Sequence, residues 1–172
     1  MAEVGLSLGC NVGQCVLTFR YVIAYLQYSG QLCKVSSLYV TEPWGTSNQP
    51  DYYNCVVVLR TLMPLPAFFR FIRELENRLG RESKGDYKPR TIDIDILFFG
   101  NTILQSTLLT IPHARMHLRR FVLEPLKEVY PEWEHPVLKQ TAKDLLDGTS
   151  DDSKVVRLSP YPKWLYSSSI NG

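Results

Sequence analysis

The stretch PRTIDIDILFFG, residues 89–100, decides the fold, because it combines the pattern of a buried strand with two charged side chains. In a β-strand, residues two apart share a face and lie about 6.6 Å apart along the chain. One face of this stretch carries Ile92, Ile94 and Ile96, and the other carries Thr91, Asp93 and Asp95. The isoleucine face predicts a core strand. The aspartate face must meet water, a cation or a substrate, because burying an unpaired carboxylate is costly.

The segments before this strand alternate between strand and helix patterns. The sequence predicts strands over 3–9, 32–41 and 52–61, a helix capped by Asn11 and ended by Gly30, and a helix that begins at Pro64 and Pro66 and ends at Gly80. A loop rich in Pro, Gly and Asn fills residues 42–51. The order is β-α-β-β-α-β, which predicts an α+β fold with a ferredoxin-like core and an antiparallel sheet.

The residues after Gly100 extend this core. Residues 101–111 predict a small β excursion, and VLEPLKEVYP (122–131) predicts a short helix that begins at Pro125. The tail from residue 134 is weakly patterned, and DGTSDDS (147–153) is typical of a surface loop. We expect C-terminal helical additions on a single domain over residues 1–172, with about 160–172 as a loosely packed tail.

Composition limits the partners of the chain. The formal net charge is only +2 over 172 residues, so no global basic field favours nucleic acid. The N-terminus, MAEVGLSLGC, lacks the basic start and apolar run of a signal peptide, and no apolar stretch is long enough to span a membrane. We therefore expect a cytoplasmic protein, and a monomer, that binds neither nucleic acid nor membrane.

The cysteines form no C-x-x-C pair, and most of them lie in apolar patterns. They are Cys10, Cys15, Cys33 and Cys55. We expect reduced, partly buried thiols rather than a metal site or a disulfide.

The aspartate pair suits a metal. Mg²⁺ binds one or two carboxylates plus substrate phosphates, and two such ions lie about 3.5–4 Å apart in a two-metal site. The alternative is that the carboxylates form ion pairs with Arg90 or a lysine on an exposed sheet face. The surrounding cations favour the metal; they are Arg81, Lys84, Lys88, Arg90, His113, Arg115, His117, Arg119 and Arg120. Carboxylates that hold Mg²⁺ beside a cation cluster match the needs of a nucleoside triphosphate.

Two familiar site patterns are missing or incomplete. The chain contains neither the G-x-x-x-x-G-K-[ST] phosphate loop nor the G-x-G-x-x-G fingerprint, so a nucleotide would bind in a different kind of site. His113 and His117 have the spacing of helical zinc ligands, but three arginines crowd them and no Glu follows the first histidine. A phosphate or leaving-group contact therefore suits His113 better than zinc, with a neutral surface histidine as the alternative.

The loop TEPWGTSNQPDYYN (41–54) gathers aromatic side chains beside an amide. Trp44, Tyr52 or Tyr53 could stack on a flat heterocycle, and Asn54 could both donate to its edge and accept from it. A surface loop held down by its aromatic residues remains the alternative from this stretch alone.

Several stretches, in this order, resemble the 6-hydroxymethyl-7,8-dihydropterin pyrophosphokinase family of folate biosynthesis. They are SLGCN (7–11), TEPWG with QPDYYN (41–54), LENRLGR (75–81), PRTIDIDILFFGN (89–101) and IPHARMHLRRFVLEPL (111–126). The resemblance reaches to about residue 136. It implies a ferredoxin-like core and transfer of pyrophosphate from ATP to the hydroxymethyl group of the dihydropterin, which yields AMP and the pterin diphosphate.

The resemblance also implies roles for individual residues. Asp93 and Asp95 would bind two Mg²⁺ ions. The pterin pocket would be lined by Gly9, Thr41, Pro43, Trp44, Tyr52, Asn54 and Phe121. ATP would be held by Glu76, Arg81, Lys84, Arg90, Ile96, His113 and Arg119. Arg90 and Arg119 would act with the aspartates in catalysis.

The sequence departs from the family pattern at two places. Serine is frequent in the family where this chain has Cys10. The loop before the aspartates reads ESKGDYK (82–88), whereas many members carry further arginines there and a Gly before Pro-Arg. We expect Lys84 or Lys88 to supply the charge of those arginines, although a lysine offers a point charge rather than a bidentate fork.

The mechanism that follows is an in-line attack of the pterin hydroxyl on the β-phosphorus of ATP. Two other classes compete with it: another Mg²⁺-dependent phosphoryl-transfer enzyme, and a non-catalytic nucleotide-binding module with the same fold. The aromatic loop argues against the first, and the aspartate pair against the second.

Overall fold

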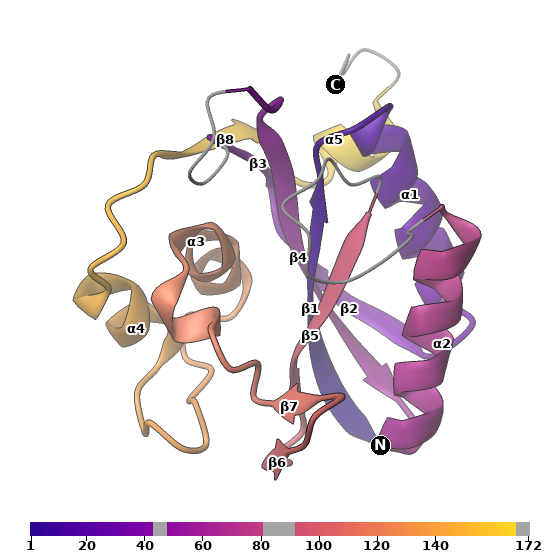
Figure 1. Cartoon of the computed structure of the whole chain (residues 1–172), viewed down its shortest axis with the longest axis vertical. Helices are drawn as coiled ribbons and strands as arrows, with labels where there is room; N and C mark the ends of the chain where they lie inside the picture. The colour runs from indigo at the N-terminus through magenta and orange to yellow at the C-terminus, as the bar shows by residue number, and fades with distance from the viewer. Residues whose placement is uncertain (43–47, 81–91, 168–172) are drawn as a thin grey trace.

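The computed structural model describes residues 1–42, 48–80 and 92–167. In these residues an antiparallel sheet of six strands has the order β5-β1-β4-β3-β8, and β2 also pairs with β4 (Figure 1). The strands are β1 (Ala2–Cys10), β2 (Gln31–Val35), β3 (Leu38–Thr41), β4 (Tyr52–Thr61), β5 (Asp93–Phe99) and β8 (Val155–Ser159). An α+β class with an antiparallel sheet is therefore confirmed.

Helices cover both faces of the sheet (Figure 1). One face carries α1 (Cys15–Leu26) and α2 (Leu65–Arg78), and the other carries α3 (Arg120–Val129) and α4 (Ala142–Gly148). Two separate clusters of buried apolar side chains fill these layers. Strand β4 contributes to both, because Val57 lies in the α1/α2 cluster and Val56 in the α3/α4 cluster.

The alternation within β5 follows the sequence prediction. Ile92, Ile94 and Ile96 are at most 4% exposed and pack in the α1/α2 core. A register shift where β5 pairs with Gly5 and Leu6 of β1 ends this alternation. The ring of Phe98 fills the space that a side chain at Gly5 would need, since a Cβ there would lie 2.2 Å from it. Because the isoleucines pack against α1 and α2, the aspartates that alternate with them lie on the sheet face that carries α3.

The predicted strand over 32–41 is in fact two strands. Val35 ends β2 and Leu38 begins β3, with Ser36 and Ser37 between them. Both serines are buried and bonded to other elements: Ser36 Oγ accepts from the Val56 N–H at 2.9 Å, and the Ser37 hydroxyl donates to Glu128 of α3 at 2.7 Å. These side-chain bonds compete with continuous strand pairing, which periodicity alone does not reveal.

Two predicted helix starts are wrong. Helix α1 begins at Cys15, after Gln14, and Asn11 does not cap it. The Asn11 amide instead donates to Gln49 Oε1 at 3.3 Å and to the Pro50 carbonyl at 3.4 Å. Helix α3 begins at Arg120, so Pro125 lies inside it rather than at its start.

The additions after β5 were predicted in part. Strands β6 (Leu104–Gln105) and β7 (Thr110–Ile111) form the expected β excursion, and η1 (Met116–Leu118) follows it. The C-terminal additions include α4, α5 (Lys163–Tyr166) and the unpredicted strand β8. Residues 160–167 are not a loose tail, because Trp164 is fully buried and its indole N–H donates to the Ser36 carbonyl at 2.9 Å.

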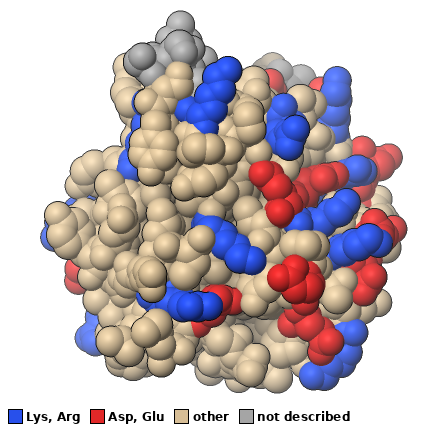
Figure 2. Space-filling model, turned by 180° about the vertical axis from the view of Figure 1, so that it is seen from behind, with Lys and Arg blue, Asp and Glu red and all other residues tan. Residues whose placement is uncertain are grey.

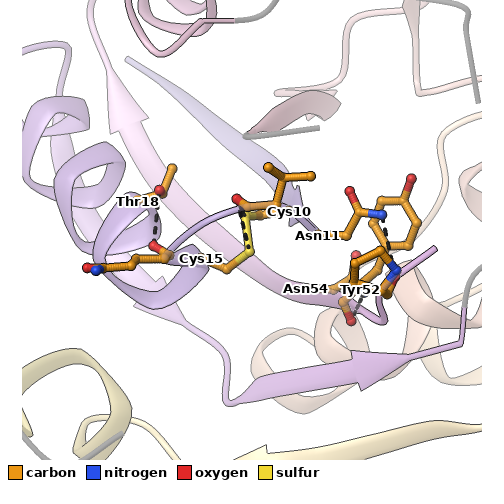
Figure 3. Close-up of a disulfide and its surroundings, with 9 residues drawn as sticks. Cys10, Asn11, Cys15, Thr18, Tyr52 and Asn54 are labelled. Atoms are coloured by element: carbon orange, nitrogen blue, oxygen red, sulfur yellow. Dashed lines mark hydrogen bonds between the residues drawn. A yellow bond between two sulfur atoms is a disulfide. The ribbon is translucent and has the colours of Figure 1, made fainter. Parts of the chain in front are cut away.

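The prediction of four reduced thiols is also wrong. Cys10 and Cys15 form a disulfide (Figure 3). The end of β1 and the start of α1 bring their Cα atoms to 5.6 Å, within the range that a disulfide spans. This proximity depends on the fold and cannot be predicted from the spacing of the two cysteines in CNVGQC (10–15). Cys33 and Cys55 are free, and burial raises the pKa of the Cys55 thiol above its ordinary value.

The surface carries mixed charge. On the face in Figure 2, acidic and basic side chains lie among each other over one flank, beside a broad area without charge. Ion pairs one helical turn apart include Lys143 with Asp147 at 3.0 Å and Arg120 with Glu124 at 3.1 Å. Within the described ranges, no helix is both long and apolar enough to cross a membrane.

Candidate active site

A cavity of about 480 Å³ opens on the α3 face of the sheet. Strands β1, β3, β4 and β5 and the start of α3 provide most of its wall. The lining residues are Ser7, Gly9, Thr41, Glu42, Gln49, Tyr52, Asn54, Asp93, Asp95, Arg115, Leu118, Arg119, Phe121 and Asp151. Eight of the residues predicted from the sequence lie together in this wall: Gly9, Thr41, Tyr52, Asn54, Asp93, Asp95, Arg119 and Phe121.

Strand register explains how they meet. Gly9 of β1 pairs with Asn54 of β4 on one side and with Asp93 of β5 on the other. Two residues earlier, Ser7 pairs with Asp95. Three segments that are far apart in the sequence therefore present their side chains at one place on the sheet.

An amide and a hydroxyl form one end of the cavity. The Asn54 amide donates to Thr41 Oγ1 at 3.0 Å, and both residues are at most 5% exposed. This bond fixes the orientation of the amide, so that its edge has a defined donor and acceptor direction. A Cβ at Gly9 would lie 3.5 Å from Asn54 Oδ1, which shows that any side chain there would project over this end.

The start of α3 forms the opposite wall. Arg119 directly precedes the helix, and its guanidinium carbon lies 5.7 Å from the centre of the Phe121 ring. That distance is within the range of a cation–π contact. Phe121 thus offers an aromatic face, and Arg119 places a positive charge beside it.

The carboxylates of β5 face a histidine. Asp95 Oδ2 lies 3.8 Å from His113 Nε2, and both side chains are half-buried. The Arg115 backbone N–H donates to His113 Nδ1 at 3.2 Å, so the nitrogen that faces Asp95 carries the proton of the neutral ring. Within the described residues no group of three or more His, Cys, Asp or Glu side chains converges as a metal site.

A second cavity of about 250 Å³ adjoins the first, and Asp95 lines both. Ile96 and His113, two of the residues predicted to hold ATP, lie in its wall. The remaining wall comes from Phe69, Ile72 and Arg73 of α2, from Ile94, and from residues 106–110 and Ala114. Asp95 therefore stands at the junction of two adjacent compartments.

Glu76 has a different environment from the other predicted residues. It is fully buried in α2 and lines neither cavity. Its carboxylate accepts from the Ile94 backbone N–H at 2.9 Å and from Arg73 at 3.0 Å. The bond to Ile94 attaches α2 to β5 directly beside the aspartates, whereas the contact with Arg73 lies within α2. The role of Glu76 in binding ATP stays a prediction.

Other predicted residues lie outside the described part of the chain. They are Pro43, Trp44, Arg81, Lys84, Lys88 and Arg90. Sequence reasoning also missed five residues of the cavity wall: Ser7, Glu42, Gln49, Leu118 and Asp151. Ser7 could have been found, because it shares a strand face with Gly9. No pattern in the sequence indicated Asp151, because it reaches the cavity only through the packing of the C-terminal segment.

Known proteins resemble the chain over most of its length. The sequence profile of 7,8-dihydro-6-hydroxymethylpterin-pyrophosphokinase (HPPK) matches residues 5–131. A 2-amino-4-hydroxy-6-hydroxymethyldihydropteridine pyrophosphokinase of Aquifex aeolicus is 33% identical over 145 residues, which are 84% of this chain and 90% of that protein. The protein of the same name from Haemophilus influenzae is 35% identical over 165 residues, 93% of this chain and 100% of that one.

Solved structures share the fold. A crystal structure of Plasmodium falciparum HPPK-DHPS aligns with a TM-score of 0.68 at 18% identity and covers 85% of this chain. This chain spans less than half, 44%, of that longer protein. The profile match and the identity to whole relatives show that the chain belongs to the 7,8-dihydro-6-hydroxymethylpterin-pyrophosphokinase family.

Proposed function

We infer that this chain transfers the pyrophosphoryl group of ATP to the hydroxymethyl group of 6-hydroxymethyl-7,8-dihydropterin, in folate biosynthesis. The products are AMP and the pterin diphosphate. Family membership supports the activity. The single structural observation that carries it is the position of Asp95, which lines both the larger cavity and its smaller neighbour. A transfer between two substrates needs its charged groups at such a junction.

The larger cavity is the proposed pterin pocket. Its Asn54–Thr41 pair can read the amide-like edge of a pterin, since the orientation of the Asn54 amide is fixed. Tyr52 and Phe121 supply aromatic surface for the flat ring. Gly9 leaves the space over Asn54 open. Pro43 and Trp44 complete this pocket in the proposal.

The smaller cavity is the proposed ATP side. Ile96 and His113 line it, and Arg119 lies across the junction in the wall of the larger cavity. The protonated Nε2 of His113 can donate to a phosphate oxygen. Glu76, Arg81, Lys84 and Arg90 belong to the same proposed set. Arg90 and Arg119 would balance the negative charge that spreads over the transferring group.

The donor set fits two Mg²⁺ ions. Asp93 and Asp95 are hard oxygen ligands on one strand face, and both line the larger cavity. Mg²⁺ usually keeps water and substrate phosphates as its other ligands, so two protein carboxylates suffice. Bound there, the ions would neutralise the phosphates and make the attacking hydroxyl more acidic. Asp93 and Asp95 are the residues that would hold them.

The chain's own residues then contribute position and charge. The pterin pocket would aim the hydroxymethyl oxygen toward the β-phosphorus, in line with the bond to the departing AMP. Arg119 would stabilise the charge that develops during transfer. A new P–O bond forms to the pterin oxygen as the bond between the α- and β-phosphates breaks. The hydroxyl proton passes to solvent, and the oxygen that bridged the α- and β-phosphates departs as part of AMP.

The order β5-β1-β4, followed by β2 and β3, with α1 and α2 on one face, supports the ferredoxin-like form of the core.

One copy of the chain supplies both cavities, which supports a monomer as the working unit. The use of ATP as a substrate supports a cytoplasmic location for the protein. The Cys10–Cys15 disulfide is the feature that departs from this compartment, where thiols are usually reduced.

Product analysis tests the function. The chain is mixed with ATP, Mg²⁺ and 6-hydroxymethyl-7,8-dihydropterin, and the phosphorus signals are followed by ³¹P NMR. We expect AMP together with a pterin diphosphate, and no reaction of the 6-methyl analogue, which lacks the hydroxyl. Formation of ADP with a pterin monophosphate would contradict the proposal, since it would mean attack on the γ-phosphorus.

A further inference from the structure

We propose that Asp151 is a positioning residue, which reaches back from the C-terminal segment to hold the α3 wall of the pterin pocket in place. This inference rests on the proposed function. Asp151 lies in the wall of the larger cavity, 20 residues beyond the end of the family match at residue 131. Its Oδ2 accepts from the Arg120 backbone N–H at 2.8 Å. Arg120 is the residue between Arg119 and Phe121, the two side chains that form this wall.

Helix α3 has no cap of its own. Arg119 stands at the N-cap position without a side-chain hydrogen bond, and the first turn contains no acidic residue. The first N–H groups of a helix need acceptors, and a negative charge there interacts favourably with the helix dipole. The Asp151 carboxylate supplies both from a segment that follows the helix by about 20 residues. The wall therefore depends on a residue that is distant in sequence.

The carboxylate is itself held firmly. Asp151 Oδ1 accepts from the Ser153 N–H at 3.0 Å, and the Asp151 N–H donates to Thr149 Oγ1 at 3.3 Å. Burial raises the pKa of Asp151, but the hydrogen bonds from Ser153 and Arg120 outweigh it, so the pKa lies below its ordinary value. Asp151 is consequently charged at neutral pH, and its direction is fixed.

The C-terminal segment is anchored by contacts that do not involve Asp151. Strand β8 pairs with β3, where Val155 lies opposite Thr41 of the pterin pocket. Farther on, the Trp164 ring packs edge-on against Phe19, and Arg20 donates to the Trp164 carbonyl at 2.6 Å. Loss of the Asp151 carboxylate should therefore release the start of α3 while β8 and α5 stay docked.

Three variants test the proposal. D151A removes both acceptor oxygens, D151N keeps an oxygen for the Arg120 N–H, and D152A is the control. Asp152 is exposed and forms no hydrogen bond or ion pair among the described residues. We expect D151A to raise the KM for the pterin about fivefold, the loss typical of one helix cap. The KM for ATP should rise by a smaller factor, because Arg119 is the one member of the proposed ATP set that lies in this wall. D151N should recover most of this loss, and D152A should match the wild type.

Two outcomes would overturn the proposal. One is a pterin KM of D151A within twofold of that of D152A. The other is an equal rise in both KM values together with a lower unfolding midpoint. That result would mean that Asp151 stabilises the fold by capping α3 and does not position the pocket wall. If the wild type turns over no pterin, the proposed function fails by itself. Hydrogen exchange at the amides of residues 120–123 then decides on the positioning role: it must rise in D151A and not in D152A.

Discussion

At the scale of single residues, the site depends on side chains that the strand register brings together. Gly9, Asn54 and Asp93 lie side by side across three strands. Alternation along the strand was sufficient to predict the face that carries Asp93. Asn54 was predicted from its amide beside the aromatic loop, and Gly9 from the resemblance to the family. Glu76 and Asp151 were different. The internal contacts of Glu76 and the place of Asp151 in the wall come from packing between distant segments, which local pattern does not encode.

Replacement of Gly9 tests the shape of the proposed pterin pocket. A Cβ at Gly9 meets Asn54 Oδ1 at an ordinary contact distance of 3.5 Å, so G9V should fold. Its methyl groups would occupy the space over Asn54, and we expect the pterin KM to rise at least about tenfold. Steady-state kinetics of G9V measure this rise. G148V is the matched control, since Gly148 borders open space. An unchanged pterin KM in G9V would place the pterin elsewhere.

At the scale of elements, hydrophobic periodicity did not predict how β1 connects to α1 or how β2 connects to β3. The Cys10–Cys15 disulfide joins the end of β1 to the first residue of α1. On the other side of Cys10, the Asn11 side chain points away from the disulfide, toward Tyr52 and Asn54 (Figure 3). The helices and strands themselves follow apolar periodicity, whereas their ends follow specific side-chain bonds such as those of Ser36 and Asn11.

Reduction of the disulfide should lower stability. The bridge closes a loop over a sequence separation of 5, for which loss of chain entropy in the unfolded state gives about 2 kcal/mol. We expect urea unfolding of the reduced protein, or of the C10S/C15S variant, to show a free energy lower by about this amount. The control is C33S, because Cys33 is exposed and free. Four thiols that react with iodoacetamide in the denatured, unreduced protein would contradict the disulfide.

At the scale of the whole molecule, two apolar layers stabilise the sheet, and the C-terminal segment completes them. The α+β class and the β excursion were predictable, because each element carries its own periodic pattern. Strand β8 and the burial of Trp164 were not, because β8 is stabilised by pairing with β3 and Trp164 by contacts with Phe19 and Ser36. Short segments of this kind, with too few residues for a periodic pattern, obtain their order from tertiary contacts.

The α3/α4 layer should make stability depend on pH. His135 packs against Trp133, and its Nδ1 accepts from the N–H groups of Val137 and Leu138. Burial, and then repulsion from His117, lower the pKa of His135 below its ordinary value of 6.5. The unfolded chain therefore binds a proton more readily than the folded one. Stability is complete above about pH 6.5 and falls as pH drops below it.

Urea unfolding at pH 7.5 and pH 5.5 measures this effect. The H135N variant is the matched control, since an Asn side-chain oxygen can replace the Nδ1 acceptor without titrating. We expect a smaller loss of unfolding free energy between the two pH values in H135N than in the wild type. An equal loss in both proteins would assign the pH dependence to other groups.

The most direct test of the central claim measures AMP release from ATP and Mg²⁺, with and without the hydroxymethyl-dihydropterin, in the wild type and in D95N. The account predicts AMP only when the pterin is present. It also predicts that D95N keeps its fold and that its rate falls by a factor of at least about 100. D152N, with the same change of charge on an exposed residue, should keep the wild-type rate. AMP release by D95N at a near wild-type rate would contradict the role of the carboxylate pair.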